Sequence, residues 1–126
     1  MTAKDSIFEG LGVALVTPYR KGAVDTDAAS RLAEHLVERG VRALYPCGCT
    51  GEATSLTREE RTKLIRTVVE AVRGRAAVIP GTGTANTDET IELSKEAIRL
   101  GADAVMVIIE DAREENIRRE LGRLTS

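Results

Sequence analysis

The sequence predicts a parallel α/β fold built from four successive β/α units. Short apolar strands, loops and amphipathic helices alternate along the 126 residues, and the first three helical stretches each end at a glycine. Aromatic residues make up only 2% of the chain, so Val, Ile, Leu and Ala must fill the core. Alternating strands and helices indicate parallel β/α construction, and an aliphatic core is typical of parallel sheets covered by helices.

The first unit is expected between residues 12 and 40. Its strand covers residues 12–17, and Lys21 and Gly22 mark a turn after it. Asp25 is the expected N-cap of a helix that runs to about Arg39. The side chains expected on its buried face are Leu32, Leu36 and Val37.

The second unit follows directly, with a strand over residues 41–47. Thr57 and Glu60 have the spacing of a capping box, which predicts the start of the second helix. The side chains expected on its buried face are Leu64, Ile65, Val68 and Val72.

The last two units are predicted in the same way. The third has a strand over residues 76–80 and a helix near 88–100, with Ile91 and Ile98 facing inward. The fourth strand, 104–109, is almost wholly apolar, as expected of a strand buried on both faces. A final helix within 111–126 rests on one apolar stripe: Ile117, Leu121 and Leu124.

Right-handed crossovers between sequential neighbours predict a parallel sheet in the order 1-2-3-4 with its helices on one face. We expect a single domain over residues 1–126. The repeat length suits both an open doubly wound sheet and a sector of a barrel, so periodicity alone leaves that choice open.

Composition narrows the classes of partner. The formal net charge is −2, so no cationic face indicates binding to nucleic acid or to an anionic membrane. The first ten residues lack the apolar core of a secretory signal, and no apolar run approaches the roughly 20 residues that span a bilayer. We therefore expect a cytosolic protein whose partners are small molecules or protein.

Cys47 and Cys49 are two residues apart, and the chain has only one histidine. This is a poor set of metal ligands, so both cysteines are interpreted as reduced thiols at or beside a strand end. We expect neither a metal nor a cofactor.

Two loops carry the candidate chemistry, because ligands of parallel β/α proteins bind at the carboxyl ends of the strands. They are Gly48-Cys49-Thr50-Gly51-Glu52 and Gly81-Thr82-Gly83-Thr84. Their small residues allow close backbone approach to a ligand. Neither loop is a dinucleotide fingerprint or a Walker A loop. Taken singly, each loop is also explained by the needs of a turn alone.

Taken together, the motifs resemble the family of dihydrodipicolinate synthase and N-acetylneuraminate lyase. The similarity covers residues 8–108, and the C-terminal helix 111–126 is divergent. The matching strings, in chain order, are Val16-Thr17-Pro18, Gly48-x-Thr50-Gly51-Glu52, Ser55-Leu56, Glu59-Glu60-Arg61, Val78-Ile79-Pro80-Gly81-Thr82-Gly83 and Gly101-Ala102-Asp103-Ala104.

This resemblance implies one half of a (β/α)8 barrel, a parallel (β/α)4 sector, and a class I aldolase or lyase. In that family a lysine on the sixth strand forms a Schiff base with pyruvate or a similar 2-oxo acid, which then adds to an aldehyde such as aspartate semialdehyde in lysine biosynthesis. It also implies a homo-oligomer.

The resemblance further assigns roles within the first loop. Gly48, Thr50 and Gly51 are expected to hold the carboxylate of the substrate, and Cys49 occupies the place of a catalytic threonine in a proton relay. The exchange replaces a hydroxyl with a larger, more acidic thiol that forms weaker hydrogen bonds.

The sequence also departs from the family pattern. It has no counterpart of the Schiff-base lysine, because Lys4 and Lys21 lie in a tail and a turn, and Lys63 and Lys95 fall on predicted helices. The family's Thr-Pro-Tyr-Tyr string is replaced by residues 109–112, Ile-Glu-Asp-Ala. We therefore expect a truncated lyase that is inactive alone.

A lysine-feedback site, present in some members of the family, is not expected here. Arg58 and Ala85 stand where regulated members often have histidine and asparagine, although Glu89 fits the pattern.

Two other functions remain open from the sequence: a self-associating half-barrel and a small-anion binding module. Self-association is expected because a half-barrel exposes side chains that a closed barrel buries. Alternate residues of a strand point to opposite faces of the sheet, so two sets of side chains are possible. One set comprises Val13, Leu15, Leu44, Val78 and Met106, and the other comprises the strand residues between them.

Overall fold

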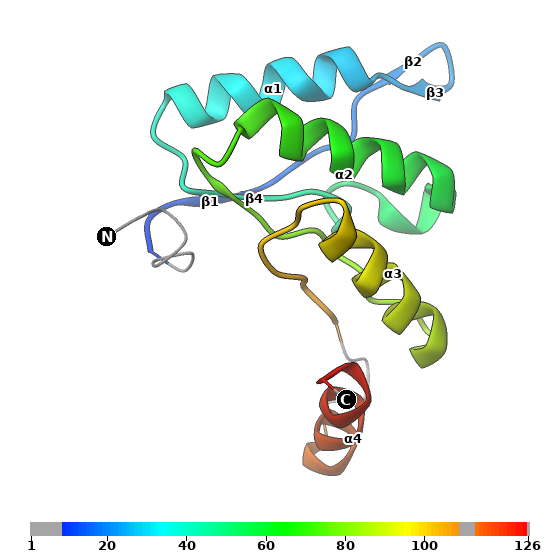
Figure 1. The fold of residues 1–126 in the computed structure, drawn as a ribbon. Helices are drawn as coiled ribbons and strands as arrows, with labels where there is room; N and C mark the ends of the chain where they lie inside the picture. The colour runs from blue at the N-terminus through cyan, green and yellow to red at the C-terminus, as the bar shows by residue number, and fades with distance from the viewer. Residues whose placement is uncertain (1–8, 109–112, 126) are drawn as a thin grey trace.

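The computed structural model describes residues 9–108 and 113–125 and has helices packed along one side of a parallel sheet (Figure 1). The sheet contains β1 (Gly12–Ala14), β4 (Ala43–Tyr45) and β5 (Ala77–Val78) in the order β1-β4-β5. Both pairs are parallel, and Val13, Leu44 and Val78 lie in register across the three strands. The predicted parallel arrangement of the first three strands is confirmed.

The fourth position in the sheet is occupied by the segment around Met106. Met106 forms an isolated parallel bridge with Gly81, and its amide donates to the Pro80 carbonyl at 2.9 Å. The predicted order 1-2-3-4 is therefore correct, but the predicted strand 104–109 is wrong in extent, because only this bridge forms. Residue 109 lies outside the described residues.

The three paired strands are also shorter than predicted. Pro46 follows β4 and Pro80 closely follows β5. Since proline has no amide to donate, each of these positions lacks one ladder hydrogen bond, although the Pro46 and Pro80 carbonyls still accept from the Gly81 and Met106 amides at 2.9 Å.

A β-hairpin that the sequence did not predict lies outside this sheet. It pairs β2 (Tyr19–Arg20) with the antiparallel β3 (Ala23–Val24). Lys21 and Gly22 connect the two strands with φ angles of 52° and 80°. Two positive φ angles are the requirement of a type I′ turn, so the turn predicted at these residues is confirmed.

The first two helices begin at the predicted caps. Helix α1 (Thr26–Glu38) is capped by Asp25, whose Oδ1 accepts from the Ala28 amide at 3.0 Å. Helix α2 (Arg58–Val72) begins with the complete capping box between Thr57 and Glu60, with bonds of 2.9 and 3.1 Å. The predicted inward residues of α2 are all buried: Leu64, Ile65, Val68 and Val72.

Helix α3 (Thr87–Arg99) buries a different face from the one predicted. Ile98 is 53% exposed, so its inward placement was wrong, while Ile91 is partly buried. The buried side chains are Thr90, Leu93 and Ala97. These three have the spacing of one helical stripe, and the stripe begins with a threonine that an apolar pattern does not identify.

Helix α4 (Glu114–Thr125) confirms the existence of the predicted last helix. Its predicted stripe is only partly correct, because Ile117 is half-buried and Leu121 is half exposed. The side chain of Leu124 lies outside the described part of the chain. Polar contacts join α4 to the start of α3, where the Thr87 hydroxyl donates to the Glu120 carboxylate at 2.8 Å.

Alternating strand residues divide between the two faces of the sheet. Leu15, Leu44 and Val78 are buried in one cluster with residues of α1 and α2, and Val13 packs against it. The opposite face carries a smaller cluster: Ala43, Ala77 and Ile79, with Tyr45 and Ala104. Met106 follows Ala104 on this opposite face and is 43% exposed. The sequence left open which set of alternating strand residues a half-barrel would expose. The helices cover four members of the first set, Val13, Leu15, Leu44 and Val78, and its fifth member, Met106, lies on the opposite face.

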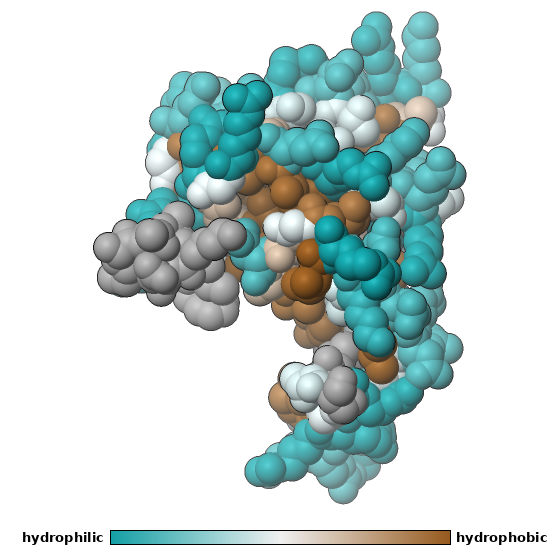
Figure 2. Space-filling view, in the orientation of Figure 1, coloured by the Kyte–Doolittle hydropathy of each residue, from teal (hydrophilic) through white to brown (hydrophobic). Residues whose placement is uncertain are grey.

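The face opposite the helices remains partly uncovered toward the carboxyl ends of the strands. Val16, Met106 and Ile108 are all exposed there. Figure 2 shows apolar residues gathered in a hollow beneath α1 and α2, bordered on one side by α3 and α4. Among the described residues, no helix is long and apolar enough to cross a membrane.

Candidate active site

The loop after β4 forms a tight turn at the carboxyl end of the sheet. Cys47 enters it with a left-handed backbone, at φ 59°. The Glu52 amide then donates to the Cys49 carbonyl at 3.0 Å, and the Ala53 amide donates to the Gly48 carbonyl at 3.2 Å. The loop continues into the short 3-10 helix η1 (Ala53–Ser55).

These bonds leave the amides at the tip of the loop uncommitted. Within residues 9–108 and 113–125, the amides of Cys49, Thr50 and Gly51 donate to no hydrogen-bond acceptor. Cys49 and Thr50 are exposed, and a Cβ added to Gly48 would have no atom within 4 Å. Consecutive amides of a turn can bind an anion, so this loop has the donors to hold a carboxylate.

Gly51 is held by the segment that follows β1. The Thr17 hydroxyl is buried and donates to the Gly51 carbonyl at 2.6 Å. A Cβ at Gly51 would lie 2.9 Å from the Leu15 carbonyl oxygen. The close approach therefore requires glycine at this position, and Thr17 fixes the peptide that follows it.

The loop after β5 packs directly against the first loop. A Cβ at Gly81 would lie 2.4 Å from the Cys47 carbonyl oxygen and 3.2 Å from the Gly48 Cα. Contacts with α3 hold the rest of this second loop: Thr82 shares a hydrogen bond of 2.8 Å with Ser94, and the Thr84 amide donates to the Thr90 hydroxyl at 2.9 Å. The two glycine-rich loops therefore form one contiguous site.

The two cysteines at this site differ in environment. Cys47 is 2% exposed, and burial raises the pKa of its thiol from 9.0 to about 11, although the nearby Arg61 charge acts in the opposite direction. Cys49 is free and exposed. The thiol that is open to a ligand is therefore the one at the predicted relay position.

Arg61 also belongs to the site, although the sequence predicted no role for it. Its guanidinium donates to the Gly81 carbonyl at 3.2 Å and to the Ala53 carbonyl at 3.1 Å. It therefore connects the two loops. The sequence placed Arg61 in the Glu59-Glu60-Arg61 string. It could not identify the two carbonyls that Arg61 contacts, because their positions depend on how the loops fold.

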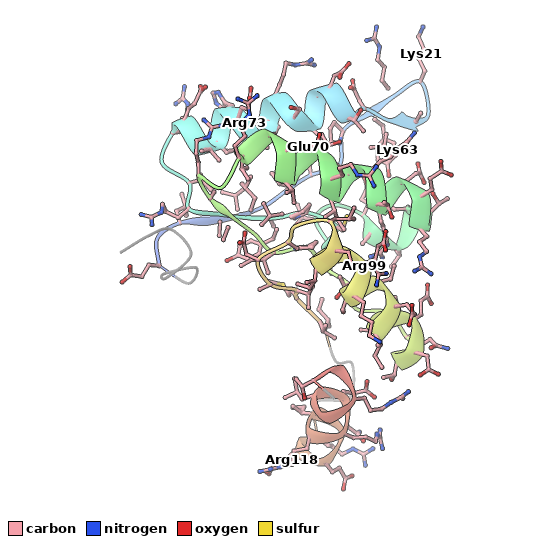
Figure 3. The ribbon with its side chains drawn as sticks, viewed as in Figure 1. Lys21, Lys63, Glu70, Arg73, Arg99 and Arg118 are labelled. Atoms are coloured by element: carbon pink, nitrogen blue, oxygen red, sulfur yellow. The ribbon has the colours of Figure 1, made fainter. Side chains whose placement is uncertain are left out.

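The described lysines lie away from these loops. Lys21 is in the β2–β3 turn and Lys63 is exposed on α2 (Figure 3). Lys95 is exposed on α3. Lys4 lies outside the described residues. No group of three His, Cys, Asp or Glu residues in the described part of the chain has the arrangement of a metal site.

A cavity of about 250 Å³ lies beside the two loops, between the starts of α2 and α3. Arg58, Ala85 and Glu89 line it together with Arg61. The three positions that the sequence compared with a feedback site are thus neighbours. A bound lysine would need hydrogen-bond acceptors for its amino group, whereas the two arginines that line the cavity can only donate.

Comparison with known proteins identifies the family of this chain. The model of the dihydrodipicolinate synthetase family matches residues 7–109. The chain belongs to this family. Two curated relatives are 4-hydroxy-tetrahydrodipicolinate synthases: one from Pelobacter propionicus is 46% identical over 102 residues, and one from Anaeromyxobacter sp. strain K is 52% identical over 100 residues.

Solved structures of dihydrodipicolinate synthases have the same fold. The enzyme from Thermotoga maritima matches with a TM-score of 0.88 at 35% identity, over 94% of this chain and 41% of its own. YagE of E. coli K12, a member of the family solved in complex with pyruvate, matches with a TM-score of 0.85 at 33% identity, over 94% and 41%. These proteins are (β/α)8 barrels, so the predicted barrel class is confirmed for this family member.

The match covers most of this chain but a minor part of each relative. It spans 81% of this chain and 35% of the Pelobacter synthase, and 79% and 34% for the Anaeromyxobacter synthase. The chain therefore spans about a third of the length of the curated relatives it matches.

Proposed function

We propose that this chain supplies the carboxylate-binding half of a pyruvate-dependent aldolase of the 4-hydroxy-tetrahydrodipicolinate synthase type. One observation carries the proposal: the amides of residues 49–51 are uncommitted at the carboxyl end of β4, in a loop within the family match. The pyruvate complex of the related YagE supports pyruvate, or a similar 2-oxo acid, as the ligand.

In this proposal Gly48, Thr50 and Gly51 hold the substrate carboxylate. Gly48 lets the ligand approach the backbone, and the amides and the Thr50 hydroxyl donate hydrogen bonds to its oxygens. The thiol of Cys49 takes the place of a relay hydroxyl and moves a proton near the bound ligand. The aldehyde that completes the reaction is an acceptor such as aspartate semialdehyde, and the product serves lysine biosynthesis.

We further propose that Schiff-base formation needs a lysine outside residues 1–126. Lys63 and Lys95 are exposed on helices away from the loops, so neither amine is placed to attack a ligand that the loops hold. The 126-residue chain alone therefore binds the 2-oxo acid without catalysing its condensation. Free thiols suit the reducing cytosol, which is the compartment we propose.

Pyruvate titration of the ¹⁵N-labelled chain tests the binding site. We expect saturating changes in the amide signals of residues 48–51, and weaker changes with acetate, which lacks the 2-oxo group. Unchanged signals would overturn the proposed site. Equal responses to pyruvate, acetate and phosphate would instead indicate a small-anion binding module.

Borohydride reduction in the presence of pyruvate tests the missing nucleophile. We expect the mass of the chain to stay unchanged, because the lysines that the structure describes, Lys21, Lys63 and Lys95, all lie away from the loops. A stoichiometric adduct on Lys63 or Lys95 would show that the active site lies elsewhere.

A second property is also proposed, self-association of the 126-residue chain. Val16, Met106 and Ile108 are exposed on the face opposite the helices. In the described residues, the outer edges of β1 and of the Met106 segment have no strand partner. A second copy would bury these side chains and pair these edges.

Light scattering over a dilution series tests this association. We expect a dimer or larger assembly, because burial of each large aliphatic side chain contributes about 1.5 to 3 kcal/mol. A cooperatively unfolding species with monomer mass at micromolar concentration would contradict it.

A further inference from the structure

Arg61 occupies an unusual environment for a charged side chain. It begins the second turn of α2 and is only 8% exposed. Among residues 9–108 and 113–125, no carboxylate forms an ion pair with it. The nearby Glu60 carboxylate already accepts from the Thr57 amide in the capping box. Burying an unpaired charge is costly, so this arginine needs a reason beyond filling space.

The contacts of Arg61 provide that reason. One nitrogen donates to the carbonyl of Ala53, the residue that begins η1 directly after the first loop, and the other donates to the carbonyl of Gly81 in the second loop. The planar guanidinium has a rigid fork of donors that can span two carbonyls at once. A lysine ammonium is a point charge on a flexible stem and has no such fork.

Both carbonyls control the position of residues 48–51. Ala53 anchors the exit of the loop, because its own amide donates to the Gly48 carbonyl. Gly81 supports the entrance, because its Cα hydrogen points at the Cys47 carbonyl in a space too small for a Cβ. A displacement of either carbonyl would therefore shift the backbone that presents the uncommitted amides.

We infer that Arg61 is a positioning residue for the carboxylate-binding loop, holding the exit and the support of residues 48–51 in the geometry that binds a 2-oxo acid. This inference rests on the proposed function. The charge of Arg61 also reaches the end of β4, since it lowers the pKa of Cys47 against the larger effect of burial. A positive charge there also favours a bound carboxylate.

Arg75, which follows the C-terminal end of α2, offers a matched control. Its guanidinium also donates to two backbone carbonyls, those of Val72 at 3.0 Å and Ala71 at 2.9 Å. These carbonyls cap the far end of α2, away from both loops. Removing Arg75 therefore deletes a comparable pair of hydrogen bonds without touching the site.

The experiment compares ¹⁵N-labelled Arg61→Met, Arg61→Lys and Arg75→Met with the unchanged chain. We expect Arg61→Met to weaken pyruvate binding about tenfold or more, because the loop would then adopt its binding geometry in only a minor fraction of molecules, and the apparent affinity falls with that fraction. Arg61→Lys keeps the charge and should recover part of the affinity. Arg75→Met should bind pyruvate as the unchanged chain does, even if its thermal midpoint falls.

Spectra without ligand separate this inference from the proposed function. Arg61→Met should move the amide signals of residues 48–51 and 81–84, and Arg75→Met should not. If the loop signals move but the unchanged chain binds no pyruvate, the proposed ligand is wrong and the positioning of the loop stands. If Arg61→Met leaves these signals and the pyruvate affinity unchanged, the inference is overturned. Should Arg61→Met not fold, Arg61→Lys is judged by the same two readouts.

Discussion

The two faces of the sheet differ in how far the chain completes them. On the face toward α1 and α2, Leu15, Leu44 and Val78 are fully enclosed by side chains of this chain. On the opposite face, Ala43 and Ala77 are buried in a smaller cluster, but the apolar surface continues to exposed positions near the carboxyl ends of the strands.

The two faces therefore have different roles: one stabilises the fold, and the other is open to contact with another chain. The covered face is a core in the ordinary sense, since its side chains interdigitate with two helices that pack against each other. The opposite face resembles half of a barrel interior, which in a closed barrel is filled from other strands. Stability should therefore depend on the first face, and association on the second.

Truncation of one residue on each face gives the largest expected contrast. Leu44 is 0% exposed, so Leu44→Ala should lower the free energy of unfolding by about 3 kcal/mol or more, from lost burial and the cavity left behind. Met106→Ala should cost less than about 1 kcal/mol in a dilute monomer, because Met106 is already partly hydrated. Chemical denaturation measures both.

The dependence on protein concentration sharpens this contrast. If a second copy covers the open face, the loss of stability caused by Met106→Ala should grow as the protein is concentrated. The loss caused by Leu44→Ala should not depend on concentration, apart from any effect of association that both variants share. Equal costs for the two variants in the dilute monomer would contradict the distinction between the faces.

The two cysteines offer a smaller contrast, read from the pH dependence of stability. Cys47 contacts the covered core, and its pKa is raised from 9.0 to about 11, first by burial and with Arg61 opposing. Below pH 9 its thiol is neutral in both states. Between pH 9 and about 11 the unfolded chain loses the proton first, so stability falls as pH rises, by about 2 to 3 kcal/mol in total.

Denaturation curves at several alkaline pH values measure this slope. Other groups also titrate in this range, so the informative quantity is the difference between variants. Cys47→Ala should lose the Cys47 contribution to the slope, and Cys49→Ala, at an exposed position, should retain it. The same slope in both variants would show that burial does not control the Cys47 thiol.

Features set by neighbouring residues were predictable from the sequence. Asp25 and the pair Thr57 and Glu60 identified two helix starts, because a capping bond joins side chains and amides only three residues apart. The turn at Lys21 and Gly22 and the parallel order of the strands were also predicted correctly. The candidate loop was identified from its composition and its resemblance to a family.

Features set by distant parts of the chain were not predictable in this way. Period-two alternation places Leu44 and Val78 on a common face, but it does not say which face meets the helices. The outward position of Ile98 and the burial of Thr90 depend on how α3 rotates against the sheet. The contacts of Arg61 with Ala53 and Gly81 require both loops to be folded.

The hydrogen bond from Thr17 connects the covered face with the candidate site. Comparing its deletion with a matched control is expected to give the smallest difference in stability among these predictions. The buried Thr17 hydroxyl donates at 2.6 Å to the Gly51 carbonyl, 34 positions along the chain. Thr17→Val keeps the shape of the side chain and deletes this bond, so stability should fall by about 1 kcal/mol and the Gly51 amide signal should move.

Thr67 supplies a control for the same substitution. Its hydroxyl also donates to a backbone carbonyl, that of Lys63 at 2.7 Å, but within one exposed turn of α2. Water can replace that bond, so Thr67→Val should change stability by less than about 0.5 kcal/mol and leave the Gly51 signal in place. Paired denaturation curves and amide spectra of the two variants measure both effects. Equal effects would mean that the buried Thr17 hydroxyl has no role in holding the loop after β4. The expected inequality would show that this loop is held in place through the Thr17 hydroxyl.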